Sequence, residues 1–91
     1  MNIQILQEWK EEERRVSLRL PDGALMALLN LPKGIDDVRL GEILVDRYKT
    51  AIGPGTFFGA PGSIRVTFSI DPKEFETGLR NISSALNDLK A

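Results

Sequence analysis

The stretch SIRVTFSI, residues 63–70, is the segment from which we predict the fold class, together with the sequence that follows it. Its side chains alternate strictly between apolar and polar, and a strand places such alternating residues on opposite faces. One face would carry Ile64, Val66, Phe68 and Ile70. The other would carry Ser63, Arg65, Thr67 and Ser69. We therefore expect a strand with one buried face.

A helix should begin directly after this strand, over residues 71–89. Asp71 is a favourable N-cap, Pro72 suits the first helical position, and Glu74 completes a pair similar to a capping box. Apolar residues then recur at spacings of four and three, namely Phe75, Leu79, Ile82, Leu86 and Leu89. The same spacing occurs in coiled coils, but this pattern is short and weakly flanked by charges. We expect the helix to pack on the sheet.

The amino-terminal residues 2–15 also predict a helix, which becomes highly charged toward its end. Its apolar residues lie at helical spacing and are Ile3, Leu6 and Trp9. In the charged run, Glu11 would face Arg14 or Arg15 one turn later, and such pairs are typical of a solvated helical side.

Two strands and another helix are expected between these segments. Residues 16–20 alternate as a short, half-buried strand. Residues 24–31 are almost continuously apolar between two turn sequences, which favours a central strand, although their Leu and Ala content would also suit a helix. Asp36 or Asp37 can cap a helix that runs through Lys49.

Residues 50–52 would form a short extended segment after the helix that runs through Lys49. The predicted order is then helix, strand, strand, helix, strand, strand, helix, in a single domain over residues 1–91. This order is typical of an α+β domain with a small, mostly antiparallel or mixed sheet and helices packed on one face. Ninety-one residues allow one hydrophobic core but are few for an independent enzyme.

The composition excludes several classes of function. The chain has no Cys and no His, which excludes disulfides, a thiolate nucleophile and a Ser-His-Asp triad, and we expect no metal site. Twelve basic and thirteen acidic residues give a net charge of −1, so we expect no nucleic-acid or membrane partner. Neither a signal-peptide pattern nor a bilayer-length apolar run is present, and we expect a cytoplasmic protein.

Residues 53–62, GPGTFFGAPG, form an unusual loop with four of the eight glycines and two of the five prolines. The loop lacks the Gly-Lys-Ser/Thr of a Walker phosphate site, and its third glycine comes too late for a dinucleotide fingerprint. The simplest interpretation is a rigid, irregular connection between two strands. Because adjacent Phe57 and Phe58 are costly to leave in water, we expect them to pack against something.

Arg65 makes a functional interpretation of the loop attractive. It would lie on the polar face of the following strand, among the small residues Ser63, Thr67 and Ser69. A guanidinium in such surroundings has room for the two-pronged approach of a carboxylate or a phosphate. An exposed strand arginine without a ligand is the alternative.

Loop and strand together resemble a known family. Pro54-Gly55-x-Phe57-Phe58-Gly59 followed by Ile64-Arg65-Val66-Thr67-Phe68 is similar to the C-terminal small domain of fold-type I (class I/II) pyridoxal-phosphate-dependent aminotransferases. Pro21-x-Gly23-Ala24 and the helix that ends near Lys49 occur upstream in the family's order. The resemblance covers residues 16–90, and residues 1–15 would be a helix from the interdomain region.

The resemblance implies that Arg65 binds the substrate α-carboxylate in a two-pronged salt bridge and that Phe57, Phe58 and Gly59 lie beside the substrate. It implies a homodimeric parent enzyme, an aminotransferase that transfers an amino group between an amino acid and a 2-oxo acid. Pyridoxal 5'-phosphate and its Schiff-base lysine would belong to the large domain of that enzyme. None of the lysines here lies in a matching motif, so we expect this chain alone to hold no cofactor and to be inactive.

Two other classes of function remain as alternatives. A stand-alone α+β module for amino-acid binding, regulation or dimerisation should bind a free amino acid without a cofactor, whereas an isolated small domain lacks half of its pocket. A purely structural interaction domain would be favoured by an exposed apolar patch of Trp9, Phe57 and Phe58.

Overall fold

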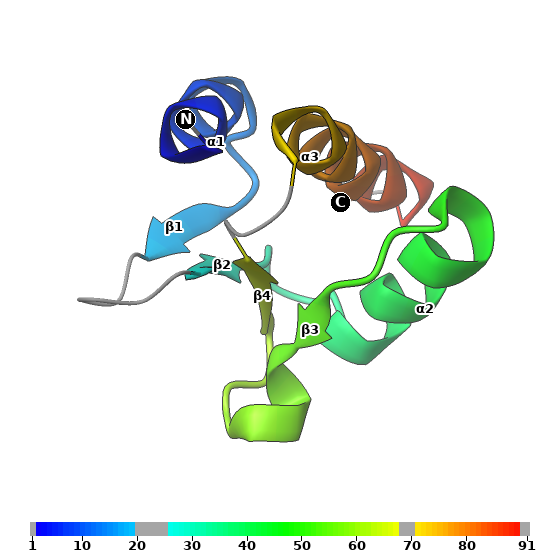
Figure 1. The fold of residues 1–91 in the computed structure, drawn as a ribbon. Coiled ribbons are helices and arrows are strands. Elements are labelled where there is room, and N and C mark those ends of the chain that lie inside the picture. Colours follow the sequence, from blue (N-terminus) through cyan, green and yellow to red (C-terminus); the bar gives the residue numbers. More distant parts are fainter. Residues whose placement is uncertain (1, 20–25, 68–70, 90–91) are drawn as a thin grey trace.

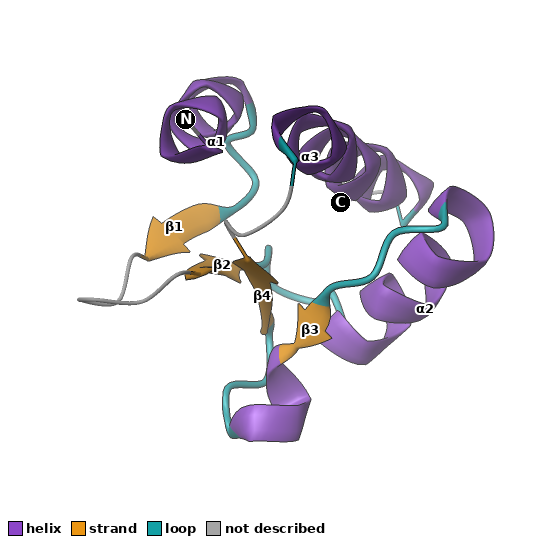
Figure 2. Ribbon diagram, viewed as in Figure 1, coloured by secondary structure: helices purple, strands orange, loops and turns teal. Residues whose placement is uncertain are grey.

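Three α-helices and a four-stranded antiparallel sheet make up the computed structural model, which describes residues 2–19, 26–67 and 71–89 (Figure 1). The helices are α1 (Asn2–Glu12), α2 (Asp37–Tyr48) and α3 (Pro72–Asp88). The strands are β1 (Ser17–Arg19), β2 (Met26–Asn30), β3 (Gly53–Pro54) and β4 (Ser63–Thr67), and a 3-10 helix, η1, spans Gly55–Phe58. Their spatial order in the sheet is β1-β2-β4-β3. The expected α+β class is confirmed (Figure 2).

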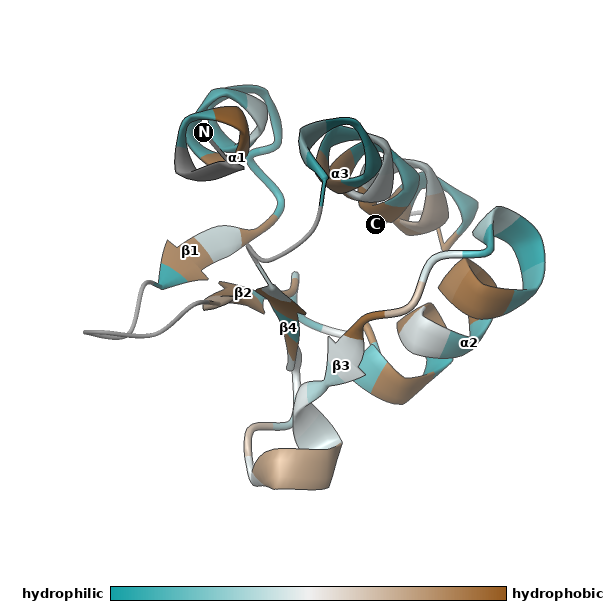
Figure 3. Ribbon diagram, in the orientation of Figure 1, coloured by the Kyte–Doolittle hydropathy of each residue, from teal (hydrophilic) through white to brown (hydrophobic). Residues whose placement is uncertain are grey.

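The register of β2 against β4 separates a buried face from an open one. Ala27 lies opposite Val66 and Leu29 opposite Ile64, and all four side chains are buried against the helices. Between these pairs, Leu28 lies opposite Arg65 on the other face. The core therefore lies between one face of the sheet and the apolar sides of all three helices, as the hydropathy colouring in Figure 3 shows.

Local sequence signals place α3 and β2 correctly. The Asp71 carboxylate accepts hydrogen bonds from the backbone amides of Lys73 (3.0 Å) and Glu74 (3.4 Å), and Pro72 is the first helical residue. The apolar stripe of α3 is buried, which confirms packing on the sheet. Within the segment 24–31, residues 26–30 form strand β2 and not a helix, and this strand pairs with both β1 and β4.

The expected helix over residues 2–15 is too long, because α1 ends at Glu12. Beyond it the chain turns, and the Glu13 side chain accepts hydrogen bonds from the backbone amide (3.2 Å), Nε (2.7 Å) and a terminal nitrogen (2.7 Å) of Arg15. Arg14 and Arg15 are therefore not helical, so the helical spacing from Glu11 on which the expected pairing rested is absent.

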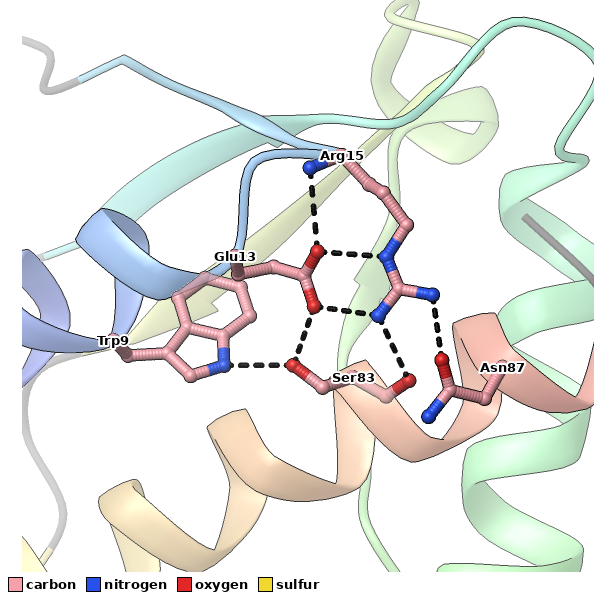
Figure 4. A network of polar contacts seen from close by, with 5 residues as sticks. All are labelled: Trp9, Glu13, Arg15, Ser83 and Asn87. Atoms are coloured by element: carbon pink, nitrogen blue, oxygen red, sulfur yellow. Dashed lines mark hydrogen bonds and ion pairs between the residues drawn. The ribbon is translucent and has the colours of Figure 1, made fainter.

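Glu13 and Arg15 also connect the amino-terminal segment to α3 (Figure 4). The Ser83 hydroxyl donates to Glu13 Oε2 (2.7 Å) and accepts from Trp9 Nε1 (2.9 Å). Arg15 reaches further along α3 and donates to the Asn87 side chain (2.7 Å). Trp9 is thus part of the α1–α3 contact, where it is partly buried, and forms no common exposed patch with Phe57 and Phe58.

Several expectations concern residues that the structure does not describe. The turn at Pro21-Asp22-Gly23 and the strand residues Phe68, Ser69 and Ile70 lie outside the described part of the chain. Within that part, no helix combines the length and apolar character needed to cross a bilayer.

Candidate functional site

The glycine-rich loop folds back on the sheet between β3 and β4, which pair through Gly53 with Arg65 and Pro54 with Ile64. Directly after β3 the chain forms η1, which projects from the sheet on the side away from α1 and α3 (Figure 1). The loop therefore is a connection between two strands, and the short turn of η1 gives it a defined shape.

At Gly55 the backbone passes very close to other atoms of the loop and of β4. A Cβ atom at this position would overlap with the carbonyl oxygen of Ala60 and the hydroxyl of Ser63. The amide of Ala60 donates to the Gly55 carbonyl (2.8 Å), so this contact closes the loop on itself. Only glycine fits without movement of the backbone.

Replacement of Gly55 by alanine is expected to lower the free energy of unfolding by about 3 kcal/mol, because backbone atoms must move to admit the methyl group. Urea unfolding followed by circular dichroism measures this change. Gly78→Ala is a matched control, because Gly78 is helical and the nearest atom to an added Cβ is 3.8 Å away. That variant should be as stable as the unmodified chain or gain up to about 1 kcal/mol. Equal stabilities of the two variants would contradict this interpretation of the loop.

Asp37 fixes the loop from the first turn of α2. Its carboxylate is almost fully buried and accepts hydrogen bonds from the Thr56 amide (2.8 Å), the Thr56 hydroxyl (2.9 Å) and the Gly62 amide (2.9 Å). Burial opposes ionisation of this carboxyl, but the hydrogen bonds from Gly62 and Thr56 outweigh it, and the pKa of Asp37 is lowered. Neighbouring Asp36 is the N-cap, accepting from Val38 N at 3.0 Å.

Arg65 lies on the open face of the sheet with its backbone paired on both sides, to β2 and to β3. Its guanidinium carbon is 4.6 Å from the centroid of the Phe58 ring, a cation–π contact. No hydrogen bond or ion pair joins this guanidinium to another described residue, although four other arginines of the described chain form ion pairs. A strand arginine that is rigid at its backbone and without an anionic partner is suited to bind an anion from outside.

The structure brings together some of the predicted site residues and separates others. Phe58 packs against Arg65 and keeps 39% of its surface exposed, whereas Phe57 is 75% exposed, so the expectation that both rings pack is wrong for Phe57 in this chain. Gly59 ends η1 in the left-handed conformation, with φ of 81°. Ser63 is not an open neighbour of Arg65, because it is buried beneath the loop and its hydroxyl donates to the Ala60 carbonyl (2.6 Å).

A groove of about 1150 Å³ opens beside Arg65. One wall is the segment 48–53, which leads from α2 into β3, and the other is the first half of α3. Its lining includes the buried residues Val66, Phe75 and Leu79, the half-buried Ile52 and the exposed Lys49 and Lys73.

A site for pyridoxal phosphate requires a Schiff-base lysine and a carboxylate for the ring nitrogen of the cofactor. Lys49 and Lys73 are exposed, and the two buried carboxylates, Glu13 and Asp37, already accept internal hydrogen bonds. These residues of the described chain do not fit the cofactor. Among the described residues, no three acidic side chains cluster as a metal site would require.

Comparison with known proteins shows a similarity to one class of enzymes. No family model matches the chain. In sequence and in fold, however, it is similar to a segment of pyridoxal-phosphate-dependent aminotransferases, which confirms the resemblance inferred from the loop and strand.

Three relatives document this similarity. The chain is 38% identical over 53 residues to a "Probable aspartate/prephenate aminotransferase" of Aquifex aeolicus (strain VF5), a match covering 58% of this chain and 14% of the relative. A PLP-dependent aminotransferase from Streptococcus suis 89-1591 superposes over 96% of this chain and 23% of its own, with a TM-score of 0.87 and 24% identity. Aspartate aminotransferase from Thermotoga maritima superposes over 94% of this chain and 23% of its own, with a TM-score of 0.75 and 26% identity. The chain thus spans less than a quarter of the length of these relatives.

Proposed function

We propose that residues 1–91 form the C-terminal small domain of a pyridoxal-phosphate-dependent aminotransferase, with residues 1–15 coming from its interdomain region. The parent enzyme transfers an amino group between an amino acid and a 2-oxo acid and acts as a homodimer. The observation that carries this proposal is Arg65, whose guanidinium lies on the open face of the sheet without an acidic partner among the described residues, in a chain that resembles aminotransferases in sequence and fold.

In this proposal Arg65 anchors the substrate α-carboxylate. The β4 backbone is held between β2 and β3, and the Phe58 ring lies against the guanidinium, so the side chain loses little freedom when a carboxylate arrives. Two parallel N–H donors then fix the carboxylate in one orientation, and this fixes the neighbouring Cα–H bond relative to the rest of the enzyme.

Residues around Arg65 would complete the substrate side of the pocket. Phe58 excludes water from one side of the guanidinium, and exposed Phe57 and Gly59 lie further out on the same loop, where the substrate would approach. The large domain of the parent supplies the cofactor, the Schiff-base lysine and the remaining walls. The cofactor provides the carbanion chemistry, while this chain binds and orients the substrate.

The isolated chain is expected to show no transamination and no lysine adduct that is specific for one position. The chain is mixed with pyridoxal phosphate, reduced with borohydride and analysed by peptide mass spectrometry. Because Lys49 and Lys73 are exposed and have no cofactor site around them, labelling should be substoichiometric and spread over several lysines. A full-length aminotransferase is the positive control. A stoichiometric adduct at one lysine of this chain would contradict the proposal that the large domain alone holds the cofactor.

A further inference from the structure

We propose that Asp37 is a positioning residue for Arg65: through the loop that it holds, it keeps Phe58 against the guanidinium and so presets Arg65 to bind a carboxylate. This inference rests on the proposed function for its consequence in the enzyme, but the structural link that it describes can be tested in this chain alone.

In the first step of the link, Asp37 accepts hydrogen bonds from both ends of the segment 56–62. Two of its hydrogen bonds go to Thr56, within η1, and the third goes to the amide of Gly62, directly before β4. One carboxylate thus closes the loop, and an aspartate that is 2% exposed cannot exchange these donors for water without local opening.

The second step leads from η1 to Arg65. Thr56 and Phe58 belong to the same single turn, so a displacement of Thr56 also moves the Phe58 ring. That ring lies close to Gly53 as well as to Arg65: a Cβ placed on Gly53 would be 3.6 Å from Phe58 and 3.4 Å from Arg65 Nε. Gly53, Phe58 and Arg65 therefore lie next to one another, and η1 sets the place of Phe58 among them.

The third step concerns what an amide would do in place of the carboxylate. Asn at position 37 offers one acceptor oxygen and one NH2 group, whereas the site presents donors from two backbone amides and one hydroxyl. At least one donor would lose its partner and face another donor. The expected result is a looser η1, a Phe58 ring that leaves the guanidinium, and a more mobile Arg65.

The experiment compares Asp37→Asn with Asp36→Asn, a matched control at the preceding residue. Asp36 is an exposed N-cap, and Asn caps helices equally well, so the control should behave like the unmodified chain. In NMR spectra of this chain, ring currents of Phe58 should shift the Arg65 side-chain resonances. In Asp37→Asn these shifts should fall by more than half, while β2–β4 cross-strand contacts persist. Unchanged Arg65 shifts in a folded Asp37→Asn chain would overturn the link.

A second variant keeps the test decisive if Asp37→Asn does not fold. Thr56→Val removes one of the three hydrogen bonds and retains the backbone donor, so it should move the Arg65 resonances in the same direction by a smaller amount. Unchanged resonances in the folded Thr56→Val chain would then count against the link.

In the full-length enzyme, Asp37→Asn should raise KM for the amino acid about 3- to 10-fold with little change in kcat, since ordering a loosened arginine is a cost of binding. If Arg65→Lys leaves the kinetics unchanged, the proposed function fails while the NMR result on Asp37 stands. If Arg65→Lys is defective and Asp37→Asn has normal KM, the positioning role fails and the proposed function stands.

Discussion

Replacement of Arg65 by lysine in the full-length aminotransferase is expected to lower kcat/KM for amino-acid donors by about 10- to 150-fold. Lysine keeps the positive charge but offers no planar pair of donors, so one charge-assisted hydrogen bond to the carboxylate is lost, worth about 1.5–3 kcal/mol. Lysine also loses the planar contact with the Phe58 ring. Steady-state kinetics with saturating 2-oxo acid measure the effect, which should appear mainly in KM.

Arg19→Lys is the matched control for this substitution. Arg19 is also an exposed strand arginine, but it lies on the edge strand β1, away from the glycine-rich loop. Its replacement should leave kcat/KM within about twofold of the unmodified enzyme, as is usual for exposed surface positions. If Arg65→Lys and Arg19→Lys had equal kinetics, Arg65 would have no role in carboxylate binding.

Acid is expected to remove about 3 kcal/mol from the stability of this chain through Glu13 alone. Hydrogen bonds from the Arg15 guanidinium, with a further one from Ser83, lower the pKa of Glu13 from 4.5 to about 2 despite its burial. A folded-state pKa below the unfolded value stabilises the fold above pH 4.5, and this contribution is lost as the pH falls toward 2. The lowered pKa of Asp37 acts in the same direction.

The Glu13→Gln variant measures how much of the loss of stability in acid comes from Glu13. This variant leaves Arg15 and the Ser83 hydroxyl facing a neutral amide, and we expect a loss of about 2–3 kcal/mol at pH 7. Its stability should then depend much less on pH between 5 and 2, as urea unfolding at a series of pH values would show. Glu12→Gln, at an exposed helical position, should retain the full pH dependence. A Glu13→Gln curve parallel to that of the unmodified chain would contradict the assignment.

The elements that sequence predicts well are those whose signals are local. The cap at Asp71 and Pro72 and the alternation along β4 need no information from elsewhere in the chain, and the structure has both. The end of α1 is different. Glu13 leaves the helix to meet Arg15 and Ser83, and Ser83 lies 70 residues further along the chain. No local pattern encodes that contact, so the charged run looks like more helix.

The same distinction between local signals and long-range contacts applies to the candidate site. The loop and Arg65 stand out in the sequence because their composition is unusual and their order resembles a family. The surroundings of Arg65 cannot be predicted from the sequence in this way, because they depend on long-range contacts. The loop folds back and buries Ser63, and Asp37 accepts hydrogen bonds from Thr56 and Gly62, which lie 19 and 25 residues further along the chain. Two consecutive aspartates before a helix are the only sequence signal for Asp37, since one of them suffices as the N-cap.

The most direct test of the central claim compares Arg65→Ala with the unmodified full-length enzyme on two amino donors that differ only in the α-carboxylate. Single-turnover rates are measured with an amino acid and with the corresponding amine. If Arg65 grips the carboxylate, the variant should lose more than about 100-fold with the amino acid and stay within about threefold with the amine, because only the amino acid can use the two lost hydrogen bonds. An equal loss with both donors would show that Arg65 does not bind the carboxylate.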